Sequence, residues 1–224
     1  DNPAMPAFLI ADDHPLFRAA LSQAATSAAP GSTVHEAEDL DGALAHLHAD
    51  PESDLGLLDL HMPGNLGLAG LAALRAEFPQ VAVAVCSGND DVRVVQRALA
   101  HGAAGFIPKR VGMADIRQAI AAMLDCRVWL PDDLRTALSQ AAPNPDDNAL
   151  AARLSRLTPQ QFRVLVLLAE GLLNKQIADR LDVQERTVKA HVTAIFEKLG
   201  VRNRTQASLL LRELAIAEPG ALAP

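Results

Sequence analysis

The feature that most constrains the fold of this chain is an alternation of short apolar runs with amphipathic segments over residues 7–124. Each of five apolar runs is followed by a segment whose apolar residues repeat with helical spacing. The runs span residues 7–11, 33–37, 55–60, 81–86 and 105–107, and the amphipathic segments span residues 15–27, 40–48, 68–78, 91–101 and 112–124. Continuous apolar runs between helices are typical of parallel strands buried on both faces.

We therefore predict a doubly wound α/β domain with a five-stranded parallel sheet. Five runs are too few for a closed eight-stranded barrel, so the sheet should be open, with strand order 2-1-3-4-5 and helices on both faces. Only 3% of the residues are aromatic and Tyr is absent, so Ala, Leu, Val and Ile must build the core. In such a sheet, the functional crevice lies at the carboxyl ends of the strands.

Polar residues stand at the ends of four of the five runs. Asp12 and Asp13 end the first run and Asp59 ends the third, while Ser87 ends the fourth and Lys109 lies just past the fifth. Parallel strands end at one edge of a sheet, so the three carboxylates should converge and repel one another. Such hard oxygen ligands suit Mg²⁺, which would let Asp59 attack an activated phosphate. The Ser87 hydroxyl and the Lys109 ammonium would complement the other phosphoryl oxygens.

Each of these five residues also has a structural explanation when it is taken alone. The acid pair before Pro15 could cap a helix, Ser87 could belong to a turn, and Lys109 could be a solvated surface charge. The functional interpretation rests on all five together, because they occur at the carboxyl ends of four different predicted strands.

A break in the alternation predicts a linker with a short helix, followed by a second domain. Residues 131–133 open a polar helix, and residues 142–148 are rich in prolines and acids. We place the first domain at residues 6–126, the linker at 127–152 and the second domain at 153–216.

The net charge also differs between the two predicted domains. Residues 1–149 carry a net charge of −11 and residues 150–224 carry a net charge of +4. A basic second domain is the part of the chain suited to bind a polyanion.

The second domain is predicted to be a small all-α unit of four helices. Thr158 and Pro159 form a helix start, and this first helix ends at Gly171. Further helices are expected over residues 174–181, 185–199 and 205–215, with a turn at 182–184. Two helices joined by a three-residue turn form a helix-turn-helix unit.

The exposed face of the third of these helices is the predicted DNA-reading surface, because the second helix of a helix-turn-helix unit enters the major groove. Lys189, Ala190 and Thr193 are the candidates for contacts to base edges, and residues nearer the helix ends should contact phosphates. The full predicted set is Lys175, Arg186, Thr187, Lys189, Ala190, Thr193, Lys198 and Arg204. A solvated helix face is the alternative explanation of these charges.

In this order, the motifs resemble those of two-component response regulators of the NarL/FixJ family, which carry a luxR-type output domain. The matching residues are Asp12-Asp13, Asp59-Leu60-His61-Met62-Pro63-Gly64, Ser87-Gly88, Gly105-Phe106-Ile107-Pro108-Lys109, Leu157-Thr158-Pro159, Asn174-Lys175-Gln176-Ile177-Ala178, Thr187-Val188-Lys189-Ala190-His191-Val192 and Lys198-Leu199-Gly200-Val201. The resemblance covers about residues 7–212. It implies a flavodoxin-like receiver domain that switches a DNA-binding transcription regulator and catalyses only its own phosphorylation and dephosphorylation.

The resemblance also implies how the acidic residues act. Asp59 would accept a phosphoryl group from a histidine of a sensor histidine kinase. Asp13 and Asp59 would ligate Mg²⁺ directly and Asp12 through water, and the backbone carbonyl of His61 would complete the protein ligands.

The remaining roles concern the switch. Ser87 would move towards the phosphoryl group, Phe106 would turn inward in step, and Lys109 would pair with the phosphate. Three positions depart from the family pattern. Phe106 replaces the commoner Tyr, Leu66 stands where an acidic residue is usual, and Gln161 replaces a Glu.

Two further expectations concern assembly and location. The phosphorylated chain should form a homodimer on double-stranded DNA, and the resemblance assigns the pairing to the last helix, residues 205–214. The unphosphorylated acidic receiver should cover the basic recognition face. A cytoplasmic protein is expected, because no membrane span or signal peptide is visible and Cys86 and Cys126 are predicted to be buried, reduced thiols.

Two alternative functions follow from the same residues. One is a DNA-binding regulator whose receiver works without phosphorylation. The other is a Mg²⁺-dependent phosphatase with an Asp nucleophile. Those enzymes generally need a second acid two residues after the nucleophile, and His61 occupies that position here, which argues against a phosphatase.

Overall fold

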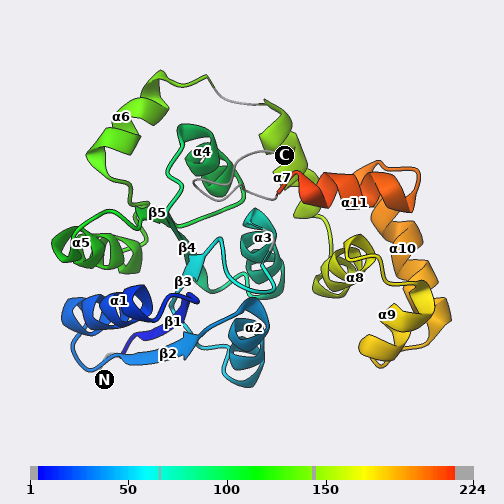
Figure 1. Cartoon of the computed structure of the whole chain (residues 1–224), viewed down its shortest axis with the longest axis horizontal. Coiled ribbons are helices and arrows are strands. Elements are labelled where there is room, and N and C mark those ends of the chain that lie inside the picture. The colour runs from blue at the N-terminus through cyan, green and yellow to red at the C-terminus, as the bar shows by residue number, and fades with distance from the viewer. Residues whose placement is uncertain (1–4, 66, 143–144, 215–224) are drawn as a thin grey trace.

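The computed structural model describes residues 5–65, 67–142 and 145–214 and contains a sheet-bearing amino-terminal domain beside a helical carboxyl-terminal domain (Figure 1). The strands are β1 (Ala7–Ala11), β2 (Thr33–Ala37), β3 (Leu55–Asp59), β4 (Ala82–Ser87) and β5 (Gly105–Pro108). They form one parallel sheet with the order β2-β1-β3-β4-β5. The predicted fold class and strand order are therefore confirmed.

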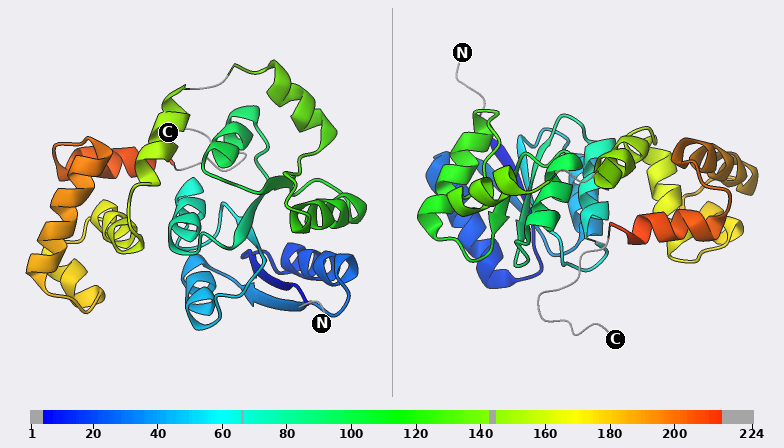
Figure 2. Two further views of the ribbon diagram at one scale, coloured as in Figure 1. Left: turned by 180° about the vertical axis from the view of Figure 1, so that it is seen from behind. Right: turned by 90° about the horizontal axis from the view of Figure 1, so that it is seen from above.

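Helices cover both faces of this sheet (Figure 2). On one side lie α1 (Pro15–Ala28) and α5 (Met113–Leu124), and on the other lie α2 (Leu40–Ala49), α3 (Leu68–Glu77) and α4 (Val92–Ala100). Successive strand residues point to opposite faces. Phe8 and Ile10 of β1 accordingly pack with α1 and α5, whereas Leu9 packs with the other layer. The sheet is consequently buried on both sides, and all five residues of β3 are buried.

The segment predicted as a linker contains two helices instead of one. They are α6 (Asp132–Gln140), which was predicted, and α7 (Pro145–Leu154), which was not. The residues that indicated a linker form a good helix start, because Pro145 begins the helix and Asp146 and Asp147 follow in its first turn. Leu150 and Leu154 are buried on the other side of α7, so tertiary packing completes the helix.

Four helices form the carboxyl-terminal domain, as predicted. They are α8 (Pro159–Ala169), α9 (Asn174–Arg180), α10 (Glu185–Leu199) and α11 (Arg204–Arg212). Thr158 and Gln161 cap α8 reciprocally, since each side chain accepts the other residue's backbone N–H. Gln161 thus serves here as the capping partner.

Residue 215, at the predicted end of the last helix, and Leu66 lie outside the described residues.

The two domains meet along α3 and α4 of the receiver side (Figure 1). Helix α8 packs on α3, where the Arg163 guanidinium pairs with the Glu77 carboxylate and also contacts His48 of α2. Helix α7 packs on α4, where Arg97 Nε lies 3.3 Å from Asp147 Oδ1. Ion pairs therefore lie at two separate points of the interdomain contact.

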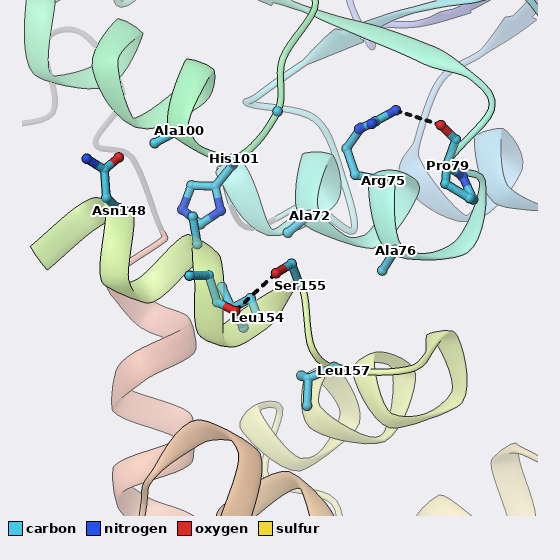
Figure 3. A pocket seen from close by; sticks show the side chains of 13 residues that line it. Ala72, Arg75, Ala76, Pro79, Ala100, His101, Asn148, Leu154, Ser155 and Leu157 are labelled. Carbon is cyan, nitrogen blue, oxygen red and sulfur yellow. Dashed lines mark hydrogen bonds between the residues drawn. The ribbon is translucent and has the colours of Figure 1, made fainter. Parts of the chain in front are cut away.

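His101 lies in this contact region, directly after α4. Its side chain is 8% exposed and lines the cleft between α4 and α7, near Asn148 and Leu154 (Figure 3). Burial lowers the pKa of the imidazole to about 4, and the neighbouring Arg97 acts in the same direction. The side chain is therefore neutral near pH 7.

His101 should make the free energy of unfolding fall as the pH drops from about 6.5 to about 4. The unfolded imidazole binds a proton below pH 6.5, whereas the folded one stays neutral until about pH 4. Each pH unit in this window costs about 1.4 kcal/mol. Between pH 7 and pH 5, wild type should lose about 2 kcal/mol more than His101→Gln in urea unfolding. Equal losses would contradict this, and His191→Gln controls for removal of an imidazole.

Candidate metal centre and nucleic-acid interface

The predicted chemical residues lie at one edge of the sheet. Asp12 directly follows β1, Asp59 ends β3, Ser87 ends β4 and Lys109 directly follows β5. The strand register pairs Ala11 with Leu58 and aligns β4 with β5, so the four exits lie at the same edge. The Lys109 backbone N–H also donates to the Ser87 carbonyl at 2.8 Å. Parallel pairing thus brings together residues that are far apart in the sequence.

A shared ion pair lies at the centre of this edge. Lys109 Nζ is 2.8 Å from Asp59 Oδ2 and 2.8 Å from Asp12 Oδ2. Both carboxylates are almost fully buried. Burial by itself lowers the pKa of the Lys109 ammonium, but the hydrogen bonds that it donates to the Asp12 and Asp59 carboxylates outweigh this effect and raise the pKa. Lys109 is therefore held in its charged form, and it offsets part of the repulsion between the acids.

His14 belongs to the same cluster, although the sequence analysis did not single it out. Its Nδ1 lies 2.7 Å from Asp13 Oδ1 and 3.4 Å from Lys109 Nζ. Ligand atoms of Asp12, Asp13, His14 and Asp59 all lie within 4.8 Å of one another. The sequence signal that could have identified His14 was its position between the acid pair and Pro15, the first residue of α1.

Two more side chains that the sequence analysis missed support the loops of this site. Arg18 Nη1 donates to the Asp12 carbonyl at 2.7 Å, and the Nε and Nη2 atoms of the same guanidinium pair with the carboxylates of Glu36 and Glu38. Asn65 Nδ2 donates to the Asp59 carbonyl at 2.9 Å. Both bind backbone oxygens of the acidic residues, so they fix the loops rather than the carboxylates themselves.

The donor set fits a hard divalent cation. Three carboxylates converge within reach of one ion, and oxygen ligands are what Mg²⁺ prefers. His61, the predicted source of a carbonyl ligand, follows Asp59 closely, and its backbone N–H donates to Asp59 Oδ1 at 3.2 Å. The cluster is compatible with a divalent metal site built from Asp12, Asp13 and Asp59.

The two predicted switch residues are both fully buried. The Ser87 hydroxyl accepts a hydrogen bond from the Asn89 backbone N–H at 3.1 Å. Phe106 pairs with Val85 across β4 and β5, and its ring is 0% exposed within the core on the α3 and α4 side. The aromatic ring therefore already lies inward in this structure.

The exposed face of α10 carries the residues predicted to read DNA bases. Lys189, Ala190 and Thr193 are all exposed, and Lys189 Nζ pairs with Glu185 Oε1 at 2.9 Å. We expected the receiver to cover this face, but in this structure it does not. The interdomain contact involves α7, α8 and the end of α11 instead, and α10 lies away from the sheet (Figure 1).

The other predicted DNA contacts divide into two groups. Lys175 and Arg186 are exposed and Thr187 is half-buried. Lys198 and Arg204 donate their side-chain hydrogen bonds to acceptors within the domain. Lys198 Nζ binds the Gln161 amide oxygen at 2.7 Å, and Arg204 donates to the Leu168 carbonyl at 3.1 Å and to the Leu172 carbonyl. These contacts tie helices together, and a role of Lys198 or Arg204 in DNA binding stays a prediction.

Fold and site together define a receiver-type domain joined to a helix-turn-helix output domain, and comparison with known proteins agrees. Residues 8–121 match the response regulator receiver domain, and residues 155–211 match the luxR family of bacterial regulatory proteins. The chain belongs to the NarL/FixJ family of two-component response regulators, whose standard function is phosphorylation-switched regulation of transcription.

Individual relatives cover nearly the whole chain. The chain is 47% identical over 204 residues to the glycerol metabolism activator of Pseudomonas putida, covering 90% of this chain and 92% of that protein. It is 33% identical over 206 residues to the nitrate/nitrite response regulator NarL of Escherichia coli K12, covering 92% and 94%. A solved structure of the RcsB response regulator of Salmonella typhimurium matches with a TM-score of 0.55 and 25% identity, covering 93% and 99%. None of the helices in the described part of the chain is long and apolar enough to cross a membrane.

The cysteines differ from one another in environment, which corrects one expectation. Cys86 is fully buried as predicted, but Cys126 is exposed in the turn after α5, where it adopts a positive φ of 58°. Burial raises the pKa of the Cys86 thiol strongly, and the nearby Asp12 and Asp59 charges raise it further.

Native protein treated with iodoacetamide at pH 8 should therefore be alkylated at Cys126 and not at Cys86. The thiolate is the reactive form, and Cys86 stays protonated and shielded. Peptide mass spectrometry identifies the modified thiol, and denatured protein modified at both positions is the control. Alkylation of Cys86 in the native protein at the rate of Cys126 would contradict its assigned environment.

Proposed function

We propose that Asp59 is the phosphoryl acceptor of this regulator, that Mg²⁺ and a sensor histidine kinase are its cofactor and partner, and that it acts in the cytoplasm. One observation carries the proposal. The buried Asp59 carboxylate lies against Lys109 at the strand ends, beside two more carboxylates. The response regulator is not a classical enzyme, because its second domain matches a DNA-binding family.

The proposed transfer is a displacement at phosphorus. An Asp59 carboxylate oxygen forms the new bond to phosphorus as the bond from phosphorus to the donor imidazole nitrogen breaks, and that nitrogen takes up a proton. Bound Mg²⁺ would supply neutralisation of the developing charge on the phosphoryl oxygens. Asp12, Asp13, Asp59 and the His61 carbonyl would hold it.

Lys109 and Ser87 are the proposed partners of the acceptor. Lys109 Nζ already touches Asp59 Oδ2, so a phosphoryl group there would place new anionic oxygens within reach of the same ammonium. Ser87 ends the neighbouring strand, and its hydroxyl, whose oxygen accepts from the Asn89 backbone N–H, can donate its own hydrogen to the phosphoryl group. Phosphorylation adds negative charge at one buried point, which is the kind of local change that biases a two-state protein.

The output step we propose is sequence-specific binding of double-stranded DNA. Lys189, Ala190 and Thr193 form an exposed face in the middle of α10, at the place where a helix-turn-helix unit contacts base edges. Lys175 and Arg186 lie near helix ends, where phosphates pass. A homodimer formed by the phosphorylated protein would present two such helices to paired half-sites.

One observation favours the alternative of DNA binding that does not need phosphorylation. The recognition face is uncovered in this structure, so the receiver does not block it sterically. In that case phosphorylation would act on dimerisation alone or would have no effect. The acceptor-site variant described next separates these possibilities.

Asp59→Asn should abolish phosphoryl incorporation from acetyl phosphate with Mg²⁺, because an amide has no nucleophilic carboxylate oxygen. Intact-protein mass spectrometry measures incorporation, and EDTA should prevent it in wild type. The phosphodonor should raise dimer fraction and DNA affinity only in wild type and in the control Asp125→Asn, whose carboxylate is exposed. A phosphodonor response that persists in Asp59→Asn would exclude Asp59 as the acceptor.

Lys189→Ala should lower the preference for specific over random DNA by about 1–3 kcal/mol, because it removes a base-edge contact. Lys175→Ala should instead weaken both kinds of DNA similarly and reduce the salt slope of binding by about 1. Fluorescence anisotropy over a range of salt concentrations, with selected genomic fragments and random duplexes, measures both quantities. An unchanged preference in Lys189→Ala would remove this residue from the reading face.

A further inference from the structure

The last described turn of the output domain is attached to the amino end of α3. The Leu68 backbone N–H donates to the Leu214 carbonyl at 3.0 Å, and Arg97 of α4 donates to the Glu213 carbonyl. The Leu214 side chain is fully buried. The first N–H groups of a helix have no partner within the helix. Helix α3 therefore takes one of its capping acceptors from the other domain.

Asn65 holds the same helix end from the side of the acceptor site. Its Nδ2 donates to the Asp59 carbonyl at 2.9 Å, and its Oδ1 accepts the Gly70 backbone N–H at 2.9 Å. Its own backbone N–H donates to the Met62 carbonyl at 3.0 Å. One amide side chain thus joins the residue that carries the proposed acceptor to the first turn of α3.

The space around this amide is closely fitted. A Cβ at position 70 would lie 2.5 Å from Asn65 Oδ1, so Gly70 is what lets the side chain reach the helix. Gly67, directly before α3, has a positive φ of 60° that glycine adopts without strain. The Asn65 amide therefore bridges the Asp59 carbonyl and the Gly70 N–H in a closely packed space.

We propose that Asn65 is a positioning residue that couples the loop after Asp59 to docking of the output domain. Its amide holds the amino end of α3 where the Leu68 N–H meets the Leu214 carbonyl. A rearrangement at Asp59 that breaks the bond to Asn65 releases this helix end, and the interdomain contact is lost with it. The inference rests on the proposed function only for its trigger, because the hydrogen bonds of Asn65 and Leu68 are themselves seen in the structure.

Two variants can separate the proposed coupling role of Asn65 from a role as a simple cap of α3. A cap uses only the side-chain oxygen of Asn65, whereas the coupling also uses its N–H donor to Asp59. Asn65→Asp keeps an acceptor for the Gly70 N–H and removes the donor. Gly70→Ala leaves Asn65 unchanged but displaces its side chain, and alanine favours a helix interior over glycine. Loss of docking in Gly70→Ala would therefore not come from a weaker helix.

The experiment measures the distance between the domains in the full chain. Cys126 on the receiver and Asp179→Cys on α9 are both exposed and accept spin labels, and Cys86 is buried and stays unlabelled. Pulsed electron resonance without phosphodonor should show mainly one narrow population of distances in wild type, that of the docked arrangement. In Asn65→Asp and in Gly70→Ala, the ratio of separated to docked molecules should rise by about fivefold or more. Asn174→Asp, the same chemical change in the output domain, should leave the ratio unchanged.

Phosphoryl incorporation is measured on the same samples by mass spectrometry. Variants that incorporate phosphate within about twofold of wild type, yet show no further separation with phosphodonor, support the coupling. If either variant keeps the wild-type distances, Asn65 is only a helix cap and the inference is overturned. If wild type incorporates no phosphate, the proposed role of Asp59 fails, while the distances of the unphosphorylated variants still decide whether Asn65 clamps the domains.

Discussion

The structure at the carboxyl edge of the sheet depends on one shared ion pair, in which Lys109 contacts the carboxylates of Asp12 and Asp59 at the same distance. Two buried carboxylates this close repel each other, and an unpaired buried charge is costly. Lys109 offsets part of this repulsion but leaves the cluster with an excess of negative charge, which a divalent cation would balance. Strand pairing brings the three residues together, so the parallel sheet creates the electrostatic conditions on which any phosphoryl chemistry at Asp59 would depend.

Polar contacts are prominent between the receiver and the output domain. Arg163 meets Glu77 at one side and Arg97 meets Asp147 at another, and backbone carbonyls at the end of α11 are bound by α3 and α4. Ion pairs that are partly open to water contribute little net stability, because water competes for the same groups. A single cluster of buried apolar residues also runs from α3 and α4 into α7 and α8, so apolar burial contributes to the contact beside the ion pairs.

The sequence located the acidic cluster well but missed the residues that support it. Asp12, Asp59 and Lys109 were recognisable because each follows an apolar run, and strand ends of a parallel sheet meet at one edge. Arg18 and Asn65 had no such signal, since their partners are backbone carbonyls whose positions depend on the folded loops. The proline-rich, acidic segment that includes the first turn of α7 indicated a linker for a related reason, because the apolar surface that completes this helix comes from elsewhere in the chain.

The sequence by itself determined the order of strands and helices, the doubly wound sheet, the helix-turn-helix unit and the family, because periodicity and capping residues act locally. Tertiary structure alone decided which side chains remain exposed and able to bind a partner. It turned Lys198 and Arg204 towards internal acceptors, left Cys126 exposed, and placed the α10 reading face away from the receiver. The amino end of α3 illustrates the difference best. That helix was predicted from its own residues, but the acceptors for its first N–H groups come from Asn65 and from the opposite domain, so only folding could pair them.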